Sequence, residues 1–496
     1  MISPAFSTPV ALPSSTRKLP SSACRRVPSA VLQEPAPPVA VPITPPLWTP
    51  SSWRTKRALQ QPVYPDLEAL QRVERQLHNQ PSLVASGEMQ ALEQQLAAAC
   101  TGDAFVLQGG DCAESFDESA HGLKSTLAAL FKMAVVLMWG GKKHVVKIGR
   151  LAGQYGKPRS NDFETRDGVS LPSYRGENIN AAAFTEEARI PDPNRMMRAY
   201  HTSAATSNLV RAFAGGGYGD LTRVKEWGMD WSLTTSRGRQ YMATAERISE
   251  ALSFIDTCGL SSKQPIMTST EVYTSHEAIL LPYEQALVRQ DPFTDNFYAC
   301  SGHFLWIGER TRGIDDAHVE FARGISNPIG VKAGPTMKPE ELLRLCDVLN
   351  PNNTPGRLTV IIRMGADNIL QNLPPLIRAV QREGRNVVWV TDSMHGNTFK
   401  TESGYKTRSW NRIMAEVKGF FTVHAAEGSI PGGLHFEMTG KEVTECVGGT
   451  LQVKSEHLPQ RYESLCDPRL NQSQSLEMAF EVAEILRSMR DADYNV

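Results

Sequence analysis

The sequence lacks the features that mark several large classes of protein. Its charges nearly cancel, with 52 Lys and Arg against 53 Asp and Glu, so the whole chain offers no basic field for nucleic acid or an anionic membrane. Its best apolar run, Met133 to Trp139, is far shorter than the roughly 20 residues of a membrane-spanning helix. The eight cysteines are scattered over 496 residues, which argues against a secreted disulfide scaffold. They include no Cys-x-x-Cys pair, which argues against a zinc finger. These absences predict a soluble globular protein with mostly reduced thiols and with neither a nucleic-acid nor a membrane partner.

The first fifty residues have almost no acidic side chains. Met1 to Pro50 contains twelve prolines, many serines and alanines and four basic residues, but Glu34 is its one acid. Such a segment cannot bury a core, and a basic, Ser-rich, acid-poor composition is typical of an organelle transit peptide. We therefore interpret residues 1–52 as a disordered transit peptide, with the plastid (chloroplast) stroma as the predicted compartment ahead of the mitochondrion. An ordinary disordered tail is the alternative.

The remaining residues are apolar enough for a large core, since 41% of the chain is hydrophobic and 21% is charged. Apolar residues at three- and four-residue spacing between Leu67 and Leu96 predict two amphipathic helices. We assign these helices to an N-terminal helical extension over residues 53–103. A further helix is predicted near the end of the chain, over Ser473 to Met489, where apolar residues again share one face.

Eight short apolar or β-branched runs follow the extension and alternate with helix-like segments. They are Ala104–Gln108, His144–Ile148, Pro265–Thr270, Phe304–Ile307, Ile329–Lys332, Leu358–Arg363, Asn386–Thr391 and Gly433–Met438. Eight strands that alternate with helices predict a (β/α)8 TIM barrel, here over residues 104–496 with a helical insertion around 160–262. The competing doubly wound α/β sheet is weakened because no Gly-x-Gly-x-x-Gly follows the first strand and no Walker loop occurs.

Cationic side chains follow several of the predicted strands, and active sites of this barrel lie at the C-terminal ends of the strands. The cations are Arg150, Lys157, Arg159, Arg310, Lys332 and Arg363. Arginine binds phosphate and carboxylate with two parallel hydrogen bonds, whereas lysine acts as a point charge. So many converging cations would repel one another unless a multiply charged anion neutralised them. The predicted substrate is therefore small and polyanionic.

Three further residues at the same end of the strands are potential metal ligands. Cys112 follows the first predicted strand, His395 follows the seventh, and Glu437 lies in the eighth. A thiolate, an imidazole and a carboxylate together suit Mn, Fe, Co or Zn ions better than Mg or Ca. Their spacing alone carries no motif, so buried structural roles for Cys112 and His395 stay open from this reasoning.

Longer segments that recur in one order carry a resemblance to a known family. They are Gln108–Phe116 (QGGDCAESF), Gly153–Ser160 (GQYGKPRS), Leu171–Asn178 (LPSYRGEN), His303–Arg312 (HFLWIGERTR), Asp392–Thr398 (DSMHGNT), Gly432–Gly440 (GGLHFEMTG), Val443–Gly449 (VTECVGG) and Cys466–Asn471 (CDPRLN). They resemble the class II, plant-type 3-deoxy-D-arabino-heptulosonate 7-phosphate (DAHP) synthases. The likeness runs from about Trp48 to Met489. Several long matches in order are far more specific than any one short motif.

The resemblance implies a barrel enzyme of the transferase class. Such an enzyme condenses phosphoenolpyruvate with erythrose 4-phosphate and water, releases phosphate, and performs the first step of the shikimate pathway to chorismate and the aromatic amino acids. The implied cofactor is a divalent metal, with Mn²⁺ ahead of Co²⁺, Fe²⁺ or Zn²⁺. The implied partners are the two substrates and further copies of the chain, in a homo-oligomer that is a dimer or larger.

The resemblance also implies a role for each matched residue. The metal ligands would be Cys112, His395, Glu437 and Asp467. Phosphoenolpyruvate would be bound by Arg150, Glu309, Arg310, Lys332 and Arg363, and the phosphate of erythrose 4-phosphate by Arg159 and Ser160. The catalytic residues would be Lys157, Cys112 and His395. We expect Lys157 to donate a proton to the new hydroxyl, because a lysine among other cations can have a lowered pKa; a water on the metal is the alternative donor.

Two alternative functions remain open from the sequence. The chain could be another metal-dependent carbon–carbon bond-forming barrel enzyme, or a non-catalytic paralogue that acts as a regulatory subunit, although all four implied ligands are present.

Cys466 directly precedes Asp467, so oxidation of Cys466 with Cys112 could remove a metal ligand. A buried inert thiol at Cys466 is the simpler interpretation. The N-terminal helices and the insertion are predicted to form oligomer contacts or effector sites.

Overall fold

The computed structural model of the protein describes residues 47–118, 120–215, 219–226, 236–259, 264 and 268–493. Residues 1–46, and with them nearly all of the predicted transit peptide, lie outside the described residues. Trp48 to Val496 forms one compact unit. A short 3-10 helix, η1 (Ser52–Thr55), stands near its start, and the described residues also include the 3-10 helices η3 (Leu221–Arg223) and η5 (Ser455–Gln460).

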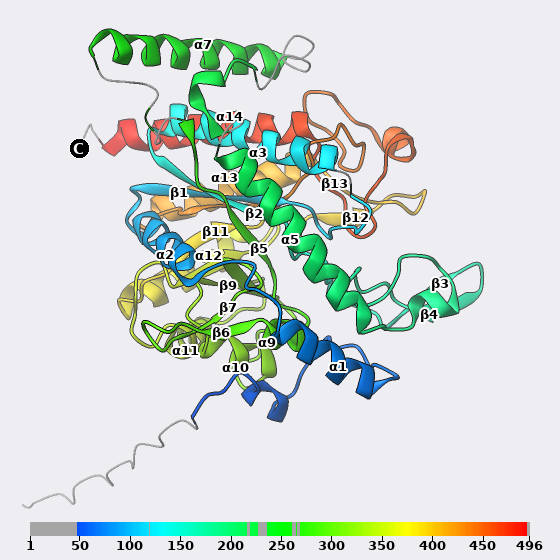
Figure 1. Ribbon diagram of the computed structural model, residues 1–496. Helices are drawn as coiled ribbons and strands as arrows, with labels where there is room; N and C mark the ends of the chain where they lie inside the picture. The colour runs from blue at the N-terminus through cyan, green and yellow to red at the C-terminus, as the bar shows by residue number, and fades with distance from the viewer. Residues whose placement is uncertain are drawn as a thin grey trace, which may run out of the picture. The chain divides into compact units, whose positions relative to one another are not determined.

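A closed barrel of parallel strands forms the centre of this unit (Figure 1). Its strands are β1 (Ala104–Gly110), β2 (His144–Arg150), β5 (Tyr273–Glu277), β8 (Phe304–Ile307), β9 (Ile329–Ala333), β10 (Leu358–Ile362), β11 (Val388–Thr391) and β14 (Gly433–Glu437). Around the barrel the order is β1-β14-β11-β10-β9-β8-β5-β2. The predicted TIM-barrel fold is therefore confirmed.

Seven of the eight predicted strands are confirmed, and one prediction is wrong. The third barrel strand is β5, Tyr273–Glu277, rather than Pro265–Thr270, of which residues 265–267 lie outside the described residues. The reason is composition: β5 reads Tyr-Thr-Ser-His-Glu, with one large apolar side chain, although four of its five residues are buried. Polar groups that fill a barrel interior hide the strand from a search for apolar runs.

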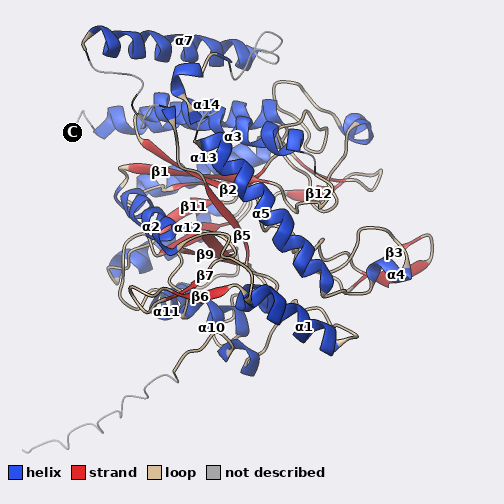
Figure 2. Cartoon of the chain, viewed as in Figure 1, coloured by secondary structure: helices blue, strands red, loops and turns tan. Residues whose placement is uncertain are grey.

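Helices follow most of the strands and cover the outside of the barrel (Figure 2). They are α3 (Ala120–Gly141), α9 (Leu281–Ala286), α10 (Ala317–Arg323), α11 (Pro339–Leu349), α12 (Ile369–Arg382), α13 (Trp410–Ala426) and α14 (Gln472–Asp493). The insertion after β2 adds α4 (Glu186–Arg189), α5 (Asn194–Ala214) and α7 (Ser236–Thr257). The predicted C-terminal helix is confirmed as α14, which packs along α3.

The helix α3 extends well beyond Met133–Trp139, the best apolar run found in the sequence. Its 22 residues are long and apolar enough to cross a membrane by length and composition. Of its most apolar window, however, 67% is buried inside the protein, and its neighbours there are α14 and the outer side of β1 and β2. Burial of this kind is expected of a core helix, because the core of a soluble protein passes the same composition test.

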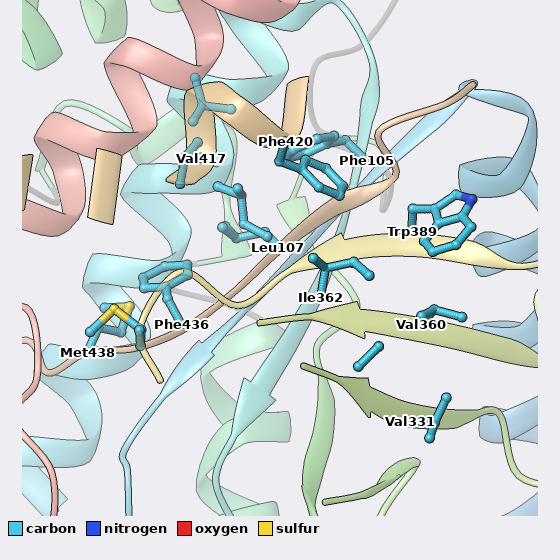
Figure 3. Packing of buried hydrophobic residues seen from close by; sticks show 14 of the residues in the cluster. Phe105, Leu107, Val331, Val360, Ile362, Trp389, Val417, Phe420, Phe436 and Met438 are labelled. Atoms are coloured by element: carbon cyan, nitrogen blue, oxygen red, sulfur yellow. The ribbon is translucent and has the colours of Figure 1, made fainter. Parts of the chain in front are cut away.

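Alternation along the strands divides the core into two parts. Phe105 and Leu107 of β1 face outward and belong to the large apolar cluster that includes Phe420 of α13 (Figure 3), as expected from the period of two in a strand. Ala104 and Val106 face the barrel interior, where they meet Leu92 and Leu96 of the N-terminal helix α2 (Ser86–Thr101). The other predicted N-terminal helix, α1 (Leu67–His78), is confirmed as well.

Within the part of the chain that the structure describes, three antiparallel hairpins lie outside the barrel sheet. They are β3–β4 (Phe163–Arg166 with Val169–Pro172), β6–β7 (Val288–Gln290 with Phe297–Ala299) and β12–β13 (Thr398–Lys400 with Lys406–Arg408). The insertion predicted as helical thus begins with a hairpin. Both β3–β4 and β12–β13 follow the C-terminal end of a barrel strand, which places them where the active site of this fold lies.

Candidate active site

A cavity of about 770 Å³ opens at the C-terminal end of the barrel strands. Ten of its lining residues are cations and four are acids. The cations are Arg150, Lys157, Arg159, Arg166, Arg310, Lys332, Arg363, Lys400, Lys406 and Arg408, and the acids are Glu164, Glu277, Glu309 and Asp467. The structure therefore gathers all six predicted cations in one cavity. The surplus of positive charge supports the prediction of a polyanionic ligand.

The strand register brings Arg150 and Glu437 level with each other on either side of Gly110. Gly110 pairs with Arg150 of β2 and with Glu437 of β14, and Arg150 Nη2 lies 3.1 Å from Glu437 Oε1. Gly110 has φ +149°, and a Cβ there would lie 2.7 Å from the carbonyl oxygen of Arg150. Only glycine allows the two neighbouring strands to present their last side chains this closely.

Arg150 and Lys332 meet at a neutral histidine in the barrel interior. His435 Nε2 lies 2.6 Å from Arg150 Nη1 and 2.8 Å from Lys332 Nζ, and its Nδ1 lies 2.7 Å from Gln108 Oε1. Burial and the two cations hold the pKa of His435 well below its usual value. Nε2 thus accepts from both cations while Nδ1–H donates to Gln108. Trp306 packs against Arg150, with 5.1 Å between its ring centre and the guanidinium carbon.

Lys332 is the one predicted phosphoenolpyruvate ligand that is a fully buried amine, at 4% exposure. Burial lowers its pKa to about 8, although the neighbouring Asp392 carboxylate opposes that shift. The same ion pair, together with His395, outweighs burial and holds the pKa of Asp392 well below its usual value. Lys332 therefore carries its charge at neutral pH and loses it in mildly alkaline solution.

Three of the four predicted metal ligands come together. His395, Glu437 and Asp467 each offer a donor atom, and these atoms lie within 4.8 Å of one another. Burial alone would raise the pKa of Glu437, but Lys157, His395 and Arg408 lower it well below its usual value, so the carboxylate is ionised. Imidazole Nδ1 of His395 lies 2.8 Å from Asp392 Oδ2, which leaves Nε2 facing Glu437. One nitrogen and two carboxylate oxygens suit a divalent transition metal.

The amine of Lys157 lies between the two carboxylates of this group. Its Nζ is 3.1 Å from Glu437 Oε1 and 2.8 Å from Asp467 Oδ2. Burial would lower the pKa of Lys157, but the two carboxylates outweigh it and raise the pKa well above its usual value. The lowered pKa expected from the sequence is therefore wrong, because its nearest neighbours are acids rather than other cations. The two carboxylates are thus stabilised by a nearby positive charge. A divalent cation would stabilise them in the same way, so the three donors fit a metal ion.

The fourth predicted ligand, Cys112, lies beside this group and is 1% exposed. Its thiol hydrogen-bonds that of Cys466, and this contact, with Lys157 nearby, lowers the pKa of Cys112 despite burial. Cys112 Sγ also lies 3.2 Å from Ser464 Oγ. Both cysteines are free thiols. Their proximity matches the pairing expected from the sequence.

The residues predicted to bind erythrose 4-phosphate lie at the mouth of the cavity and already have protein partners. Arg159 Nη2 lies 2.7 Å from Glu164 Oε1 of β3, and Ser160 Oγ accepts from Arg310 Nη2 at 2.6 Å. The β3 strand thus contributes an acid that orients the arginine. The residues predicted to bind erythrose 4-phosphate therefore contact a residue predicted to bind phosphoenolpyruvate, because Ser160 meets Arg310.

Two other predicted phosphoenolpyruvate ligands hold loops. Glu309 Oε2 accepts from the backbone N–H of Gly334 at 2.7 Å, and Glu309 Oε1 lies 3.1 Å from Arg312 Nη2. The carboxylate of Glu309 therefore fixes the loop after β9, next to Lys332. Arg363 Nη2 donates to the carbonyl oxygen of His395 at 3.2 Å, which links the ends of β10 and β11.

Sequence reasoning missed several side chains that line the cavity. They are Arg166, Glu277, Trp306, Lys400, Lys406 and Arg408. Arg166, Lys400, Lys406 and Arg408 lie on the β3–β4 and β12–β13 hairpins rather than at the end of a barrel strand. Glu277 ends β5, the strand whose position was predicted wrongly. A search restricted to residues that follow apolar strands could not find these positions.

Comparison with known proteins identifies the family of this chain. A sequence model of the class-II DAHP synthetase family matches residues 48–483. A phospho-2-dehydro-3-deoxyheptonate aldolase of Streptomyces coelicolor is 51% identical over 438 residues, which cover 88% of this chain and 97% of that protein. One of Mycolicibacterium smegmatis is 46% identical over 438 residues, which cover 87% of this chain and 93% of that protein.

Among solved structures, the crystal structure of a DAHP synthase of Thermotoga maritima matches with a TM-score of 0.32 and 11% identity, over 79% of this chain and 71% of that chain. A TM-score this low supports no conclusion about this protein. The family match, in contrast, spans the barrel and every segment that lines the cavity. This chain belongs to the class-II DAHP synthetase family.

Proposed function

We propose that the protein is a metal-dependent DAHP synthase, which condenses phosphoenolpyruvate with erythrose 4-phosphate and water to give DAHP and phosphate. One observation carries the proposal: a cavity lined by ten cations opens beside a group of one imidazole and two carboxylates. Both substrates are small polyanions, and one of them is an aldehyde that a Lewis acid can activate. Membership of the family supports the same reaction.

Phosphoenolpyruvate binds deepest in the cavity, at Arg150 and Lys332. These buried cations meet at His435, and together they match the carboxylate and phosphate of one small molecule. Arg310 and Arg363 complete its binding from the loops after β8 and β10. Glu309 acts by fixing the loop beside Lys332 through Gly334. Several fixed cations hold the enol carbon in one orientation, and orientation supplies much of the acceleration.

Erythrose 4-phosphate binds nearer the mouth, with its phosphate at Arg159 and Ser160. Its aldehyde then reaches inward toward the donor group, because Lys157 and Arg159 belong to one short segment. Glu164 on β3 orients the Arg159 guanidinium. A bidentate guanidinium and a hydroxyl suit a phosphate group.

His395, Glu437 and Asp467, with Cys112 beside them, would hold the metal, for which Mn²⁺ is our first choice. When bound, the ion supplies Lewis acidity toward the aldehyde oxygen. Lys157 is protonated at neutral pH and lies at this point in the cavity, so it can donate the proton that the new hydroxyl needs. Asp392 holds the His395 ring by accepting from Nδ1, as partners of metal-bound histidines usually do.

The test is phosphate release by the purified chain under reducing conditions, after chelation and after Mn²⁺ is restored. We expect release that needs both substrates, stops on chelation and returns with metal. A Glu437→Gln variant, which keeps the shape of the side chain but removes its charge, should lose metal-restored activity by at least about 100-fold. Absence of phosphate release with both substrates and Mn²⁺ would overturn the proposed reaction.

We also propose that the chain forms a homo-oligomer. Large apolar side chains on the inserted segments support this, since Phe163 and Val169 of the β3–β4 hairpin are 62% and 54% exposed and Phe254 of α7 is 69% exposed. Light scattering coupled to size-exclusion chromatography measures the mass directly. A monomer at micromolar concentration would contradict the proposal.

The proposed location is the plastid stroma. Its support is the composition of the first fifty residues and the start of the family match at residue 48. A fluorescent protein fused after residue 52 should be imported into isolated chloroplasts and shortened on import. A fusion in which Arg17, Lys18, Arg25 and Arg26 are changed to Glu serves as the control, and equal import of both fusions would contradict a basic transit peptide.

A further inference from the structure

Arg408, the last residue of β13, is a buried cation to which the sequence assigned no role. Its side chain is 0% exposed, which is rare for arginine. Desolvation of a guanidinium is costly unless good hydrogen bonds replace the lost water. One of its nitrogens, Nη2, has no acceptor among the described residues. The position therefore has to be explained by what the other two nitrogens do.

Each contact of the Arg408 guanidinium reaches a segment that carries one of the three clustered metal donors. Nη1 lies 2.6 Å from Glu437 Oε2 and also donates to the carbonyl oxygen of Pro468, the residue after Asp467. Nε donates to Thr398 Oγ1 at 2.9 Å, three residues after His395. One planar side chain thus connects three segments that are far apart in the sequence.

Charge balance alone does not explain this arrangement. Glu437 already has two cations on its other oxygen, because Arg150 Nη2 and Lys157 Nζ each lie 3.1 Å from Oε1. A third fixed positive charge next to a group that binds a dication would weaken metal binding by Coulomb repulsion. The contact also engages Oε2, so that Oε1 is the oxygen that faces Lys157 and His395.

The backbone of Arg408 is itself held in place. The N–H of Val447 donates to its carbonyl oxygen at 2.9 Å, and the N–H of Trp410 donates to Val447 at 2.8 Å. The preceding residue, Thr407, donates from Oγ1 to the carbonyl oxygen of Glu445 at 2.8 Å. Hydrogen bonds on both sides of the residue make it a fixed point from which a side chain can orient others.

We propose that Arg408 is a positioning residue for the metal site, which holds the segments of His395, Glu437 and Asp467 in register and fixes the rotation of the Glu437 carboxylate. The proposal rests on the metal site of the proposed function. It assigns Arg408 no contact with substrate. Partners that orient metal ligands contribute to metal affinity in other proteins by 10–100-fold.

The test measures binding of Co²⁺ alone to the full chain after chelation, by calorimetry and by the visible absorption of the bound ion. Arg408→Gln removes both the charge and the planar guanidinium with its several N–H donors. Arg408→Lys keeps the charge and removes the guanidinium. We expect both variants to bind Co²⁺ about 10–100-fold more weakly than the wild type, with an absorption spectrum altered by the changed ligand geometry.

A role in charge alone predicts the opposite sign for one variant. Without positioning, loss of a positive charge beside the dication would make Arg408→Gln bind Co²⁺ more tightly than the wild type. Unchanged or tighter binding by Arg408→Gln therefore overturns the proposal. If Arg408→Gln does not fold, the same measurement on Arg408→Lys decides, and unchanged affinity in that variant overturns the proposal.

Arg357→Lys is the matched control for loss of stability. Arg357 directly precedes β10 at the opposite end of the barrel and donates to the carbonyl oxygens of Leu349, Ala322 and Ile325. Its replacement should lower the melting temperature while Co²⁺ affinity stays at the wild-type value. Failure of the proposed function has a different outcome, in which the wild type itself neither binds Co²⁺ nor releases phosphate.

Discussion

The cations in the cavity differ in burial, and burial decides which of them can respond to pH. Arg159 at the mouth pairs with Glu164, and a guanidinium stays charged under all practical conditions. Lys332 is buried in the barrel interior against Asp392 and His435. Among the predicted phosphoenolpyruvate ligands, it is therefore the one whose charge can change in a mildly alkaline solution.

Substrate capture should weaken as Lys332 loses its proton. Because burial lowers the pKa of Lys332 to about 8, the cationic form predominates below that pH and declines above it. We expect kcat/KM for phosphoenolpyruvate to fall about tenfold per pH unit above about 8, since this ratio reports the free enzyme. In Lys332→Arg, which keeps its charge, the alkaline fall should disappear or move upward. If kcat/KM falls identically above this pH in both proteins, another group causes the fall.

The proximity of the thiols of Cys112 and Cys466 predicts that the protein is sensitive to oxidation in a specific way. Diamide takes two electrons and two protons from two adjacent thiols, which join as a disulfide, and here that would remove a predicted metal ligand. We expect diamide to inactivate the wild type and dithiothreitol to restore it, with Cys466→Ser inactivated at least about fivefold more slowly. Cys258→Ser, at an exposed cysteine, should behave as the wild type. Equal rates for Cys466→Ser and wild type would contradict the pairing.

At this scale the sequence predicted cavity residues at the ends of the strands it found and on the loops after them, but it missed Glu277, because β5 itself was missed, and the cations on the hairpins. Arg150 and Lys332 end β2 and β9 or lie one residue from the end, where the fold itself directs them to the cavity, and Glu437 ends β14 in contact with Arg150. Asp467 was found through a resemblance to a family, because it lies on a loop after β14. Arg408 carries no local signal, since a short hairpin strand outside the barrel sheet positions it.

At the scale of elements, prediction succeeded where a strand carries several apolar side chains and failed at the one strand that is almost entirely polar. β8 reads Phe-Leu-Trp-Ile and was predicted with its observed bounds, because both of its faces are buried in a parallel barrel. β5 carries Ser275 and Glu277 toward the interior, where Ser275 Oγ bonds Gln108 and the carbonyl oxygen of Gly149. Contacts made by distant segments stabilise such a strand, and a local pattern does not contain them.

The helix α13 holds the ends of two barrel strands through one buried carboxyl group. Glu416 is 0% exposed, its Oε1 accepts from the N–H of Gly365 at 2.8 Å and its Oε2 accepts from Asn397 Nδ2 at 2.7 Å. These two residues follow Arg363 and His395 by two positions each. Burial raises the pKa of Glu416 to about 8, so the folded protein keeps this proton at neutral pH.

This raised pKa makes the protein less stable as the pH rises. Between the unfolded carboxyl pKa near 4.5 and the folded value of about 8, the folded state holds a proton that the unfolded state has lost, so the free energy of unfolding falls across that window. Glu416→Gln imitates the protonated acid and cannot ionise, so its free energy of unfolding lacks this dependence on pH. We expect its stability relative to wild type to increase by about 3–4 kcal/mol between pH 5 and pH 8.5, measured from melting curves. A pH-independent difference would show that Glu416 is ionised in the folded protein.

At the scale of the whole molecule, the N-terminal extension is part of the barrel rather than an addition to it. Leu92 and Leu96 of α2 are each 0% exposed and pack against interior residues of the barrel strands. Each buried leucine of this kind contributes about 2–5 kcal/mol, against a total stability of about 5–15 kcal/mol for a typical protein. The boundary predicted at residue 103 therefore divides one apolar core.

Two shortened chains test this conclusion. A chain that starts at Trp48, where the compact unit and the family match both begin, should keep the melting temperature and the phosphate release of the full chain. A chain that starts at Ala104 loses α2 and exposes the interior ends of the strands, so it should be insoluble or unfolded by circular dichroism. Soluble, folded protein from the second chain would show that the barrel folds without the N-terminal extension.

A single substitution separates loss of the α2 contact from loss of chain length. Leu96→Ala should lower the stability of the full chain by about 2–5 kcal/mol, because the side chain it truncates fills the barrel interior. Gln94→Ala, two residues away on the exposed face of the same helix, should change the stability by less than about 0.5 kcal/mol. The large effect of Leu96→Ala follows from the barrel geometry, since the parallel strands leave space at their N-terminal ends that a helix from outside the sheet has to fill. Equal melting curves for the two variants would mean that α2 lies on the barrel without contributing to its core.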